Sequence, residues 1–167
     1  MAEAVAATRT FNTPLEAGLR TLFLMSTGTR AFDSQRLVIL DYILVHSGDL
    51  GGEPSLHPEA PSQKGELLVR RQLIQDGLAL MRSRELLERR FSGKGITYRA
   101  TKAGRHVAGQ FESDYARQLR DRARWVIDNF GGLSDRQLSE ALKEHIGDWD
   151  EELVRDLQPR GGDVDDA

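Results

Sequence analysis

The chain has 167 residues, of which 39% are hydrophobic and 29% are charged, with a formal net charge of −3 and no cysteine. This composition suits one soluble globular domain with a small appendage. The missing cysteines exclude disulfides, cysteine-ligated zinc and a cysteine nucleophile, and they fit a reducing cytoplasm. No apolar run has membrane-spanning length, and residues 1–10 lack the layout of a signal peptide, so we interpret them as a disordered leader.

The first predicted helix begins with the run Thr13-Pro14-Leu15-Glu16. Thr13 can cap the helix, Pro14 suits the first helical position, and Glu16 can complete a capping box. The helix should end near Gly28. One stripe of this helix should face the core, and it comprises Leu15, Leu19, Leu22, Phe23 and Ser26.

The second predicted helix, with Asp33 or Ser34 at its start, has the sequence QRLVILDYILVH. It is apolar nearly all round, which indicates a central, buried helix. Asp41 lies inside this run, and a buried carboxylate must be paired or hydrogen-bonded. It could act as a catalytic acid, but a bond to the backbone or to a neighbouring arginine is the more common arrangement and the one we expect.

A loop rich in glycine, proline and serine follows, from Ser47 to Gln63. A structureless loop of this length inside a compact domain is uncommon and often functional. Either it contains a short helix, or it interrupts whatever motif the flanking helices form.

A long helix is predicted from Lys64 to about Leu87. At about 100° per residue, half of its circumference is apolar and should face the core. That half comprises Leu67, Val69, Leu73, Ile74, Gly77, Leu78, Leu80 and Met81. The opposite side carries a narrow polar stripe of Lys64, Arg71, Gln75 and Arg82.

A β-hairpin is predicted next, with strands near Leu86–Phe91 and Ile96–Ala100 joined at Ser92–Gly95. Thr101 then caps another helix. This succession predicts a mainly α fold with a small β-hairpin, that is, a winged helix-turn-helix-like core followed by C-terminal helices. The loop after the second helix departs from that motif, in which a tight turn precedes the recognition helix.

Basic charge is concentrated between Lys64 and Arg105, where eleven Lys and Arg face four Asp and Glu. A basic helix and a basic hairpin are typical of a nucleic-acid contact, although arginine stems can also cover apolar surface. The candidate DNA- or partner-binding residues are Lys64, Arg71, Gln75 and Arg82 on the helix, and Arg89, Arg90, Lys94 and Arg99 on or near the hairpin.

The last third of the chain is predicted to be helical and acidic. One helix from Thr101 should direct Val107, Ala108 and Phe111 inward, and a longer one should run from Ser113 to Asn129. The core stripe of the longer helix is Tyr115, Leu119, Ala123, Val126 and Phe130.

Two further helices follow, the first capped at Ser134 and ending at Gly147, the second marked by Trp149, Leu153 and Leu157. From Ser134 onward there are eleven acidic and four basic residues. Such an end could self-associate, shield the basic middle of the chain or dock a basic partner.

Catalytic equipment is scarce in this sequence. The histidines His46, His57, His106 and His145 make no paired metal-ligand spacing. The run from Ser92 to Gly95 lacks the spacing of a phosphate loop and sits between strands. We therefore expect no catalytic residue, no cofactor and no metal, and an enzyme using Asp41 and these histidines is the weakest alternative.

Four long stretches resemble one known family: FNTPLEAGLRTLFLM, QRLVILDYILVHSGDLGG, SLHPEAPSQKGELLVRRQLIQDGLALMRSRELLERRF and GITYRAT. Together they look like the middle component of bacterial ABC-three component conflict systems. The resemblance implies a winged-helix-like accessory protein encoded with two others. One is an SMC-like ABC ATPase, related to chromosome-maintenance and repair ATPases, and the other is an effector, often a nuclease. The middle component would link or regulate them.

We therefore expect a non-enzymatic accessory subunit of a defence complex. The partner contact should lie on the 47–63 loop or the C-terminal helices, with double-stranded DNA as a plausible accessory ligand and self-association left open. The alternative is a free-standing winged-helix transcriptional regulator. The expected organisation is a leader (1–10), a winged-helix-like domain (11–130), a C-terminal helical extension (131–158) and a disordered acidic tail (159–167).

Overall fold

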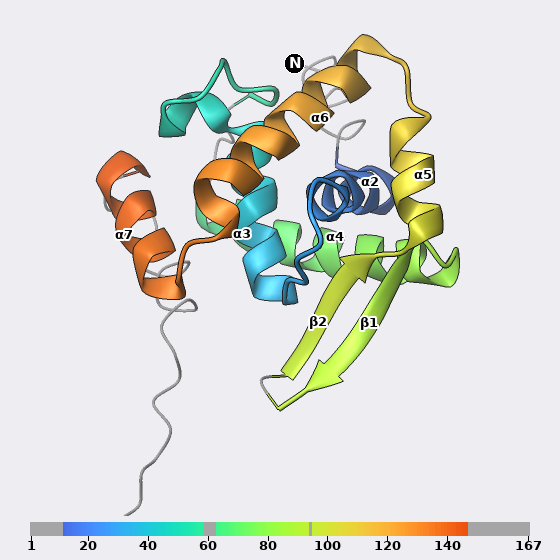
Figure 1. Cartoon of the computed structure of the whole chain (residues 1–167). Helices are drawn as coiled ribbons and strands as arrows, with labels where there is room; N and C mark the ends of the chain where they lie inside the picture. The colour runs from blue at the N-terminus through green and yellow to red at the C-terminus, as the bar shows by residue number, and fades with distance from the viewer. Residues whose placement is uncertain (1–11, 59–62, 94, 147–167) are drawn as a thin grey trace, which may run out of the picture.

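The computed structural model describes residues 12–58, 63–93 and 95–146, and Figure 1 shows helices gathered around α2 and α3 with a hairpin extending to one side. The predicted leader, the predicted helix at Trp149 and the predicted tail lie outside these residues. In chain order the elements are α2 (Pro14–Ser26), α3 (Ser34–Val45), the 3₁₀ turn η1 (Ser47–Leu50), α4 (Gln63–Ser83), β1 (Leu87–Ser92), β2 (Gly95–Ala100), α5 (Lys102–Gly109), α6 (Asp114–Val126), the π turn η2 (Ile127–Gly131) and α7 (Asp135–Ile146). The predicted class, mainly α with a small β-hairpin, is confirmed.

Local caps begin the helices where the sequence predicts them. The Thr13 and Asp33 side chains accept from the backbone N–H three residues ahead, which starts α2 and α3. Ser134 and Gln137 form a reciprocal capping box at the start of α7. At α2 only half of the predicted box forms, because the Glu16 carboxylate turns to Tyr115 instead.

The centre of the molecule is α3, in which every residue from Leu37 to Val45 is buried. Helix α4 crosses α2 so closely that a Cβ on Gly77 would lie 2.5 Å from the Gly18 nitrogen. Glycine at both positions therefore permits the approach. The crossing contacts α2 at Pro14 and Gly18, a quarter turn away from Leu15. Leu15 is 54% exposed as a result, and its predicted place in the core was wrong.

The fully buried face of α4 includes Arg70 in place of the predicted Val69, while the predicted Leu73 and Leu80 are half-buried. It comprises Arg70, Ile74, Gly77, Leu78 and Met81, at spacings that share one side of a helix. Arg70 can occupy this face because its charge is paired inside the core, as described below. Val69 then falls outside the interface and is 58% exposed, so its assignment to the core was wrong.

Helix α4 also ends earlier than predicted. Glu85 adopts a left-handed backbone conformation with φ of 58°, and its N–H donates to the Arg82 carbonyl. This closes the helix at Ser83 and turns the chain into β1. No glycine marks the position, so the sequence alone suggested that the helix continued to about Leu87.

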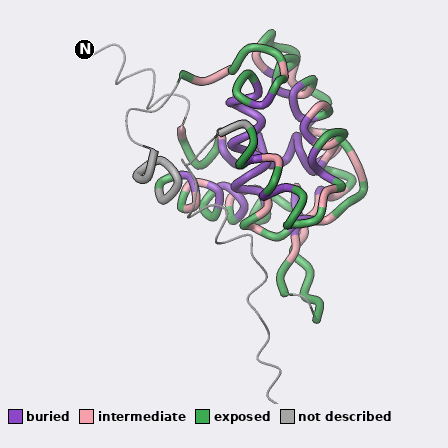
Figure 2. The backbone as a smooth tube through the Cα atoms, turned by 90° about the vertical axis from the view of Figure 1, so that its left-hand side faces the viewer, coloured by how far each residue is buried: buried purple, intermediate pink, exposed green. Residues whose placement is uncertain are grey.

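The hairpin forms close to the predicted position, and β1 pairs with β2 from Leu87 opposite Ala100 to Ser92 opposite Gly95. Its base is tied to the body by a bridge in which Phe32 and Tyr98 exchange both backbone hydrogen bonds. Figure 2 shows the rest of the hairpin extending beyond the buried core as an exposed arm.

The remaining elements complete the core as predicted. Thr101 caps α5, and the α6 stripe is buried at Leu119, Ala123, Val126 and Phe130. Leu138 and Leu142 of α7 join the same hydrophobic core. The described part of the long loop contains the short helix η1, and Leu56 and His57 donate to the Val45 carbonyl, so the loop folds against α3.

Candidate functional site

The predicted polar stripe of α4 lies partly on the surface. Gln75 and Arg82 are exposed and Arg71 is half-buried, at positions that share one helical face. Lys64 lies in the first turn of α4, but its side chain is outside the described part of the structure. Within the described residues, Arg82 is thus exposed and Arg71 is only partly accessible.

The basic residues of the hairpin do not converge on one surface. Arg89 is exposed on one face, where its guanidinium lies 4.9 Å from the centre of the Phe91 ring. Arg90 and Arg99 lie on the opposite face and both donate to the Glu88 carboxylate. The hydrogen bond from Arg99 lowers the pKa of Glu88, so this carboxylate stays ionised and offsets part of the basic charge. Lys94 lies outside the described residues.

One face of the hairpin carries apolar side chains at its base and at its tip. Alternation along the strands places Leu87, Arg89 and Phe91 on this face, opposite Ala100, Tyr98 and Ile96 of β2. At the base, Leu87, Tyr98 and Ala100 are buried. At the tip, the cross-strand partners Phe91 and Ile96 are 71% and 42% exposed. The apolar side chains at the base are therefore covered and those at the tip are not, with Arg89 between the two groups.

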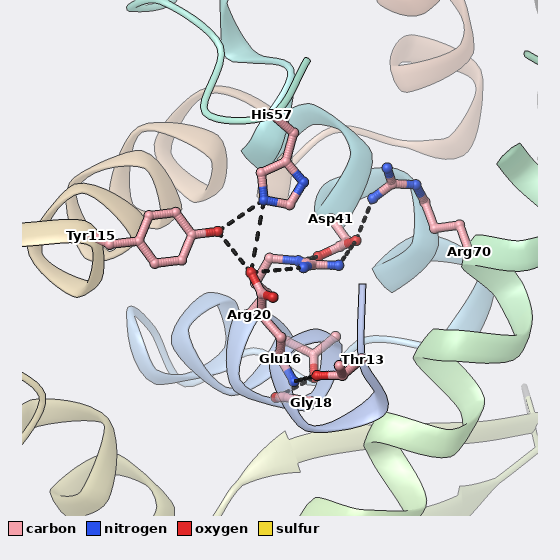
Figure 3. Close-up of polar contacts among 9 residues, drawn as sticks. Thr13, Glu16, Gly18, Arg20, Asp41, His57, Arg70 and Tyr115 are labelled. Carbon is pink, nitrogen blue, oxygen red and sulfur yellow. Dashed lines mark hydrogen bonds and ion pairs between the residues drawn. The ribbon is translucent and has the colours of Figure 1, made fainter. Parts of the chain in front are cut away.

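A second polar cluster is buried at the centre of the molecule (Figure 3). The Asp41 carboxylate is fully buried and accepts from Arg20 Nε at 2.6 Å, Arg20 Nη2 at 3.1 Å and Arg70 Nη1 at 2.5 Å. Burial alone would raise the pKa of Asp41, but the charges of Arg20 and Arg70 outweigh it and lower that pKa. Both oxygens of the Asp41 carboxylate are therefore paired with arginine, and Asp41 has the structural role expected from its sequence context.

The cluster continues from Arg20 toward the long loop. Glu16 lies 3.5 Å from Arg20 and accepts a hydrogen bond from the Tyr115 hydroxyl at 2.8 Å. His57 Nε2 lies 2.9 Å from that hydroxyl. Burial raises the pKa of Glu16 and, with the charge of Arg20, lowers the pKa of His57 to about 4. His57 is consequently neutral near pH 7.

Together these groups join α2, α3, α4, α6 and the loop after α3, which accounts for the ordered path of that loop. From the sequence, only Asp41 was expected to form a buried polar interaction; the other members of the cluster were not expected to join it. Arg20 and Glu16 carried a usable signal, because their spacing of four residues places both on one face of a helix that is otherwise apolar there. Arg70, His57 and Tyr115 meet it only through tertiary packing.

The described residues offer no sign of metal chemistry. No group of three or more His, Cys, Asp or Glu side chains within ranges 12–58, 63–93 and 95–146 is placed to hold a metal ion. Within the same ranges, no helix is both long enough and apolar enough to cross a membrane.

Comparison with known proteins identifies one family. Its sequence model, described as ABC-three component (ABC-3C) system Middle Component 2, matches residues 10–152. No curated protein matches the chain, and no solved structure does. The matched residues include every described element, from the Thr13 cap to the end of α7. The chain therefore belongs to the Middle Component 2 family of ABC-three component systems.

Proposed function

We propose that this chain is a non-catalytic adaptor of a bacterial defence complex, which docks onto its co-encoded components through the outer part of the hairpin. The components are an SMC-like ABC ATPase and an effector nuclease. The observation that carries the proposal is the uncovered apolar tip formed by Phe91 and Ile96, in a chain that belongs to a family of middle components. Exposed aromatic side chains on a rigid support are typical anchors of protein interfaces.

The order of the elements fits a winged-helix core and so supports this assignment. In that motif, a first helix, a short strand, two more helices and a two-stranded wing follow one another. Here α2, the bridge at Phe32, α3, α4 and the hairpin occur in the same order. The bridge at Phe32 stands where the short strand would pair with the wing. The long loop does not break the arrangement, because it folds back on α3 before α4 begins.

The hairpin is a better docking element than the surfaces that the sequence favoured. Ser47, Glu53 and Pro54 of the loop are bonded within the loop or to Arg122 of α6. Helix α7 uses its apolar face inside the core, at Leu138 and Leu142, and leaves a polar face outside. Among the described elements, the hairpin tip is the one that combines projection from the body with large exposed apolar side chains.

The direct test is co-expression of the chain with its two co-encoded components, followed by affinity purification. The double variant Phe91→Ser, Ile96→Ser should lose the partner, with recovery reduced at least about tenfold, as expected for removing an aromatic anchor. The matched control is Thr97→Ser on the opposite hairpin face, which should recover the complex normally. Retention of the complex by the double variant would refute docking through the hairpin tip.

A second candidate function is DNA contact, favoured by the exposure of Gln75 and Arg82 on one face of α4. Arginine can neutralise phosphates, and glutamine can pair with a base edge. The set proposed for this contact is Lys64, Arg71, Gln75, Arg82, Arg89, Arg90, Lys94 and Arg99. Binding by the chain alone should be weak and should fall steeply with salt, because each neutralised phosphate releases counterion.

The variant Arg71→Glu, Arg82→Glu separates the two functions, with Arg136→Glu, Lys143→Glu on α7 as a control of equal charge change. If α4 binds DNA, the first variant should lose about tenfold in affinity at low salt and the control should keep its affinity. Unchanged DNA affinity together with loss of the protein complex would assign the α4 face to protein contact instead.

A further inference from the structure

The backbone of β1 has hydrogen-bonding groups that point away from β2. Phe32 and Tyr98 exchange both backbone hydrogen bonds, so the N–H and C=O of Tyr98 point away from β1. Directly opposite residues in an antiparallel pair either bond to each other or both point away, and Arg89 is the residue opposite Tyr98. The N–H and C=O of Arg89 therefore point outward, and so do those of Phe91, two residues further along the strand.

These outward groups of Arg89 and Phe91, which we call the open edge of β1, bond to nothing in the part of the chain that the structure describes. Figure 1 shows β1 along the outer side of the arm, with no helix beside its outer half. Pairing with β2 runs unbroken from Leu87 to Ser92, so neither a bulge nor a proline blunts the strand. Such an edge is a template for one more strand.

The side chains beside the open edge define what kind of strand fits it. The Arg89 guanidinium rests on the ring of Phe91, on the same face of the hairpin, and pairs with no carboxylate among the described residues. On the opposite face, Arg90 and Arg99 already donate to Glu88. A strand with an acidic residue beside Arg89 and an apolar residue beside Phe91 therefore matches both charge and apolar surface.

We propose that the open edge of β1 accepts an extended segment of a co-encoded component, which pairs with it as a third strand and carries acidic and apolar residues two positions apart. Main-chain hydrogen bonds to Arg89 and Phe91 supply affinity and register, and the two side chains supply specificity. This mode of docking rests on the proposed function, because it presupposes a partner at the hairpin tip.

A second copy of β1 fits the open edge less well. Two such strands related by a two-fold axis pair only in registers that bring outward residues together. One register sets Arg89 opposite Arg89 and the next sets Arg90 opposite Arg90, and like charges directly opposite each other are destabilising. The register that sets Phe91 opposite Phe91 overlaps only residues 90–92 of each strand. The charge that disfavours self-pairing is the charge that selects an acidic strand.

The first experiment measures amide hydrogen exchange in the complex of the wild-type chain with its co-encoded components. Exchange is quenched in an aprotic solvent, and the amides of the chain are then read by NMR. The amides of Arg89 and Phe91 should exchange at least about tenfold more slowly in the complex than in the isolated chain. The matched control is the amide of Ile96, which points outward from β2 at the same tip and should change less than about twofold.

The second experiment compares Arg89→Pro with Arg89→Ala in co-expression with the same components. Both variants remove the guanidinium, but only proline removes the outward N–H, and proline is tolerated where a strand edge faces solvent. Recovery of the complex should fall at least about tenfold further in Arg89→Pro, because a carbonyl of the incoming strand loses its donor. Thermal unfolding of the two isolated variants should coincide within a few degrees, which shows that the hairpin is intact in both.

Strand addition is overturned if the amides of Arg89 and Phe91 are not slowed in the complex, or if that of Ile96 is slowed equally. Slowing that grows with the concentration of the isolated chain would assign the edge to a second copy instead. Either result leaves docking through the tip standing, provided that the Phe91→Ser, Ile96→Ser variant loses the partner. Retention of the partner by that double variant, with Arg89 and Phe91 still protected, would refute docking through the tip side chains and keep the third strand.

Discussion

The buried cluster around Asp41 and the outer hairpin are both rich in arginine, yet the two regions use it in opposite ways. Arg20 and Arg70 are buried and share one carboxylate, which itself has no contact with solvent. Arg90 and Arg99 also share one carboxylate, Glu88, but both retain considerable exposure. In the first region charge holds helices together, whereas in the second it remains available to a partner.

The difference shows why charge counts along a sequence overstate a binding surface. Arg70 is one of the basic residues between Lys64 and Arg105, but it is buried in the core and paired with Asp41. Arg105 donates to the carbonyls of Ser26 and Gly28, and so fastens α5 to the end of α2. A buried pair costs desolvation and gains Coulomb energy, so its main effect is to forbid arrangements that separate the partners. An exposed pair contributes little to stability.

The strongest test of this contrast is Asp41→Ala. It leaves Arg20 and Arg70 buried without a counter-charge, which should cost about 3–5 kcal/mol of unfolding free energy, a large share of a typical total. Chemical denaturation followed by circular dichroism measures it. Asp76→Ala is the matched control, because Asp76 is exposed on α4 and its carboxylate accepts a hydrogen bond from the neutral Gln72 side chain. A loss below 1 kcal/mol in Asp41→Ala would contradict the structural role of the cluster.

Substitutions at the base of the hairpin should destabilise the chain as much as substitutions in the hydrophobic core. Leu87→Ala removes a fully buried side chain and should destabilise the chain by about 2–5 kcal/mol through lost burial and a cavity. The same denaturation experiment applies. Near-wild-type stability in this variant would mean that the hairpin is an independent arm rather than a continuation of the core.

The loop end of the cluster predicts a pH dependence. The pKa of His57 is about 4 in the folded chain and 6.5 without perturbation, so the unfolded chain takes up the proton first. The contribution of neutral His57 is therefore complete above pH 6.5 and is lost as pH falls toward 4. At pH 5 the loss should be about 2 kcal/mol.

The raised pKa of Glu16 acts in the opposite direction, since its contribution is present below its ordinary pKa of 4.5 and is lost as pH rises through the folded value. The effect of His57 is isolated by comparing the wild type with His57→Gln, which lacks the titrating ring. Denaturation at pH 7 and pH 5 should show a smaller acid loss in the variant. An identical loss in both proteins would mean that His57 is not buried beside Tyr115.

The smallest expected effect is at the hairpin tip. Phe91→Ala removes an aromatic ring that is 71% exposed, so the free energy of unfolding should change by no more than about 0.5 kcal/mol. Thermal unfolding of the variant and of wild type measures this directly. A larger destabilisation would show that another part of the chain covers Phe91.

Much of the fold was predictable because its signals are local. Capping by Thr13, Asp33, Thr101 and Ser134 depends on side chains that bond backbone groups three residues away. The position of the hairpin follows from alternation around a short turn, and the buried stripe of α6 follows from its period. These features need only neighbouring residues, so the sequence determined them by itself.

Tertiary structure decided the rest. The rotation of α4 depends on the close crossing of Gly18 and Gly77, which moved Arg70 into the core and Val69 out of it. The end of α4 at a left-handed Glu85 has no local residue signal. The hairpin tip is exposed because no described element covers it, which alternation along the strand cannot reveal. Sequence determined which residues are charged or apolar, and only the packing of distant segments decided which of those charges are paired and which apolar side chains are uncovered.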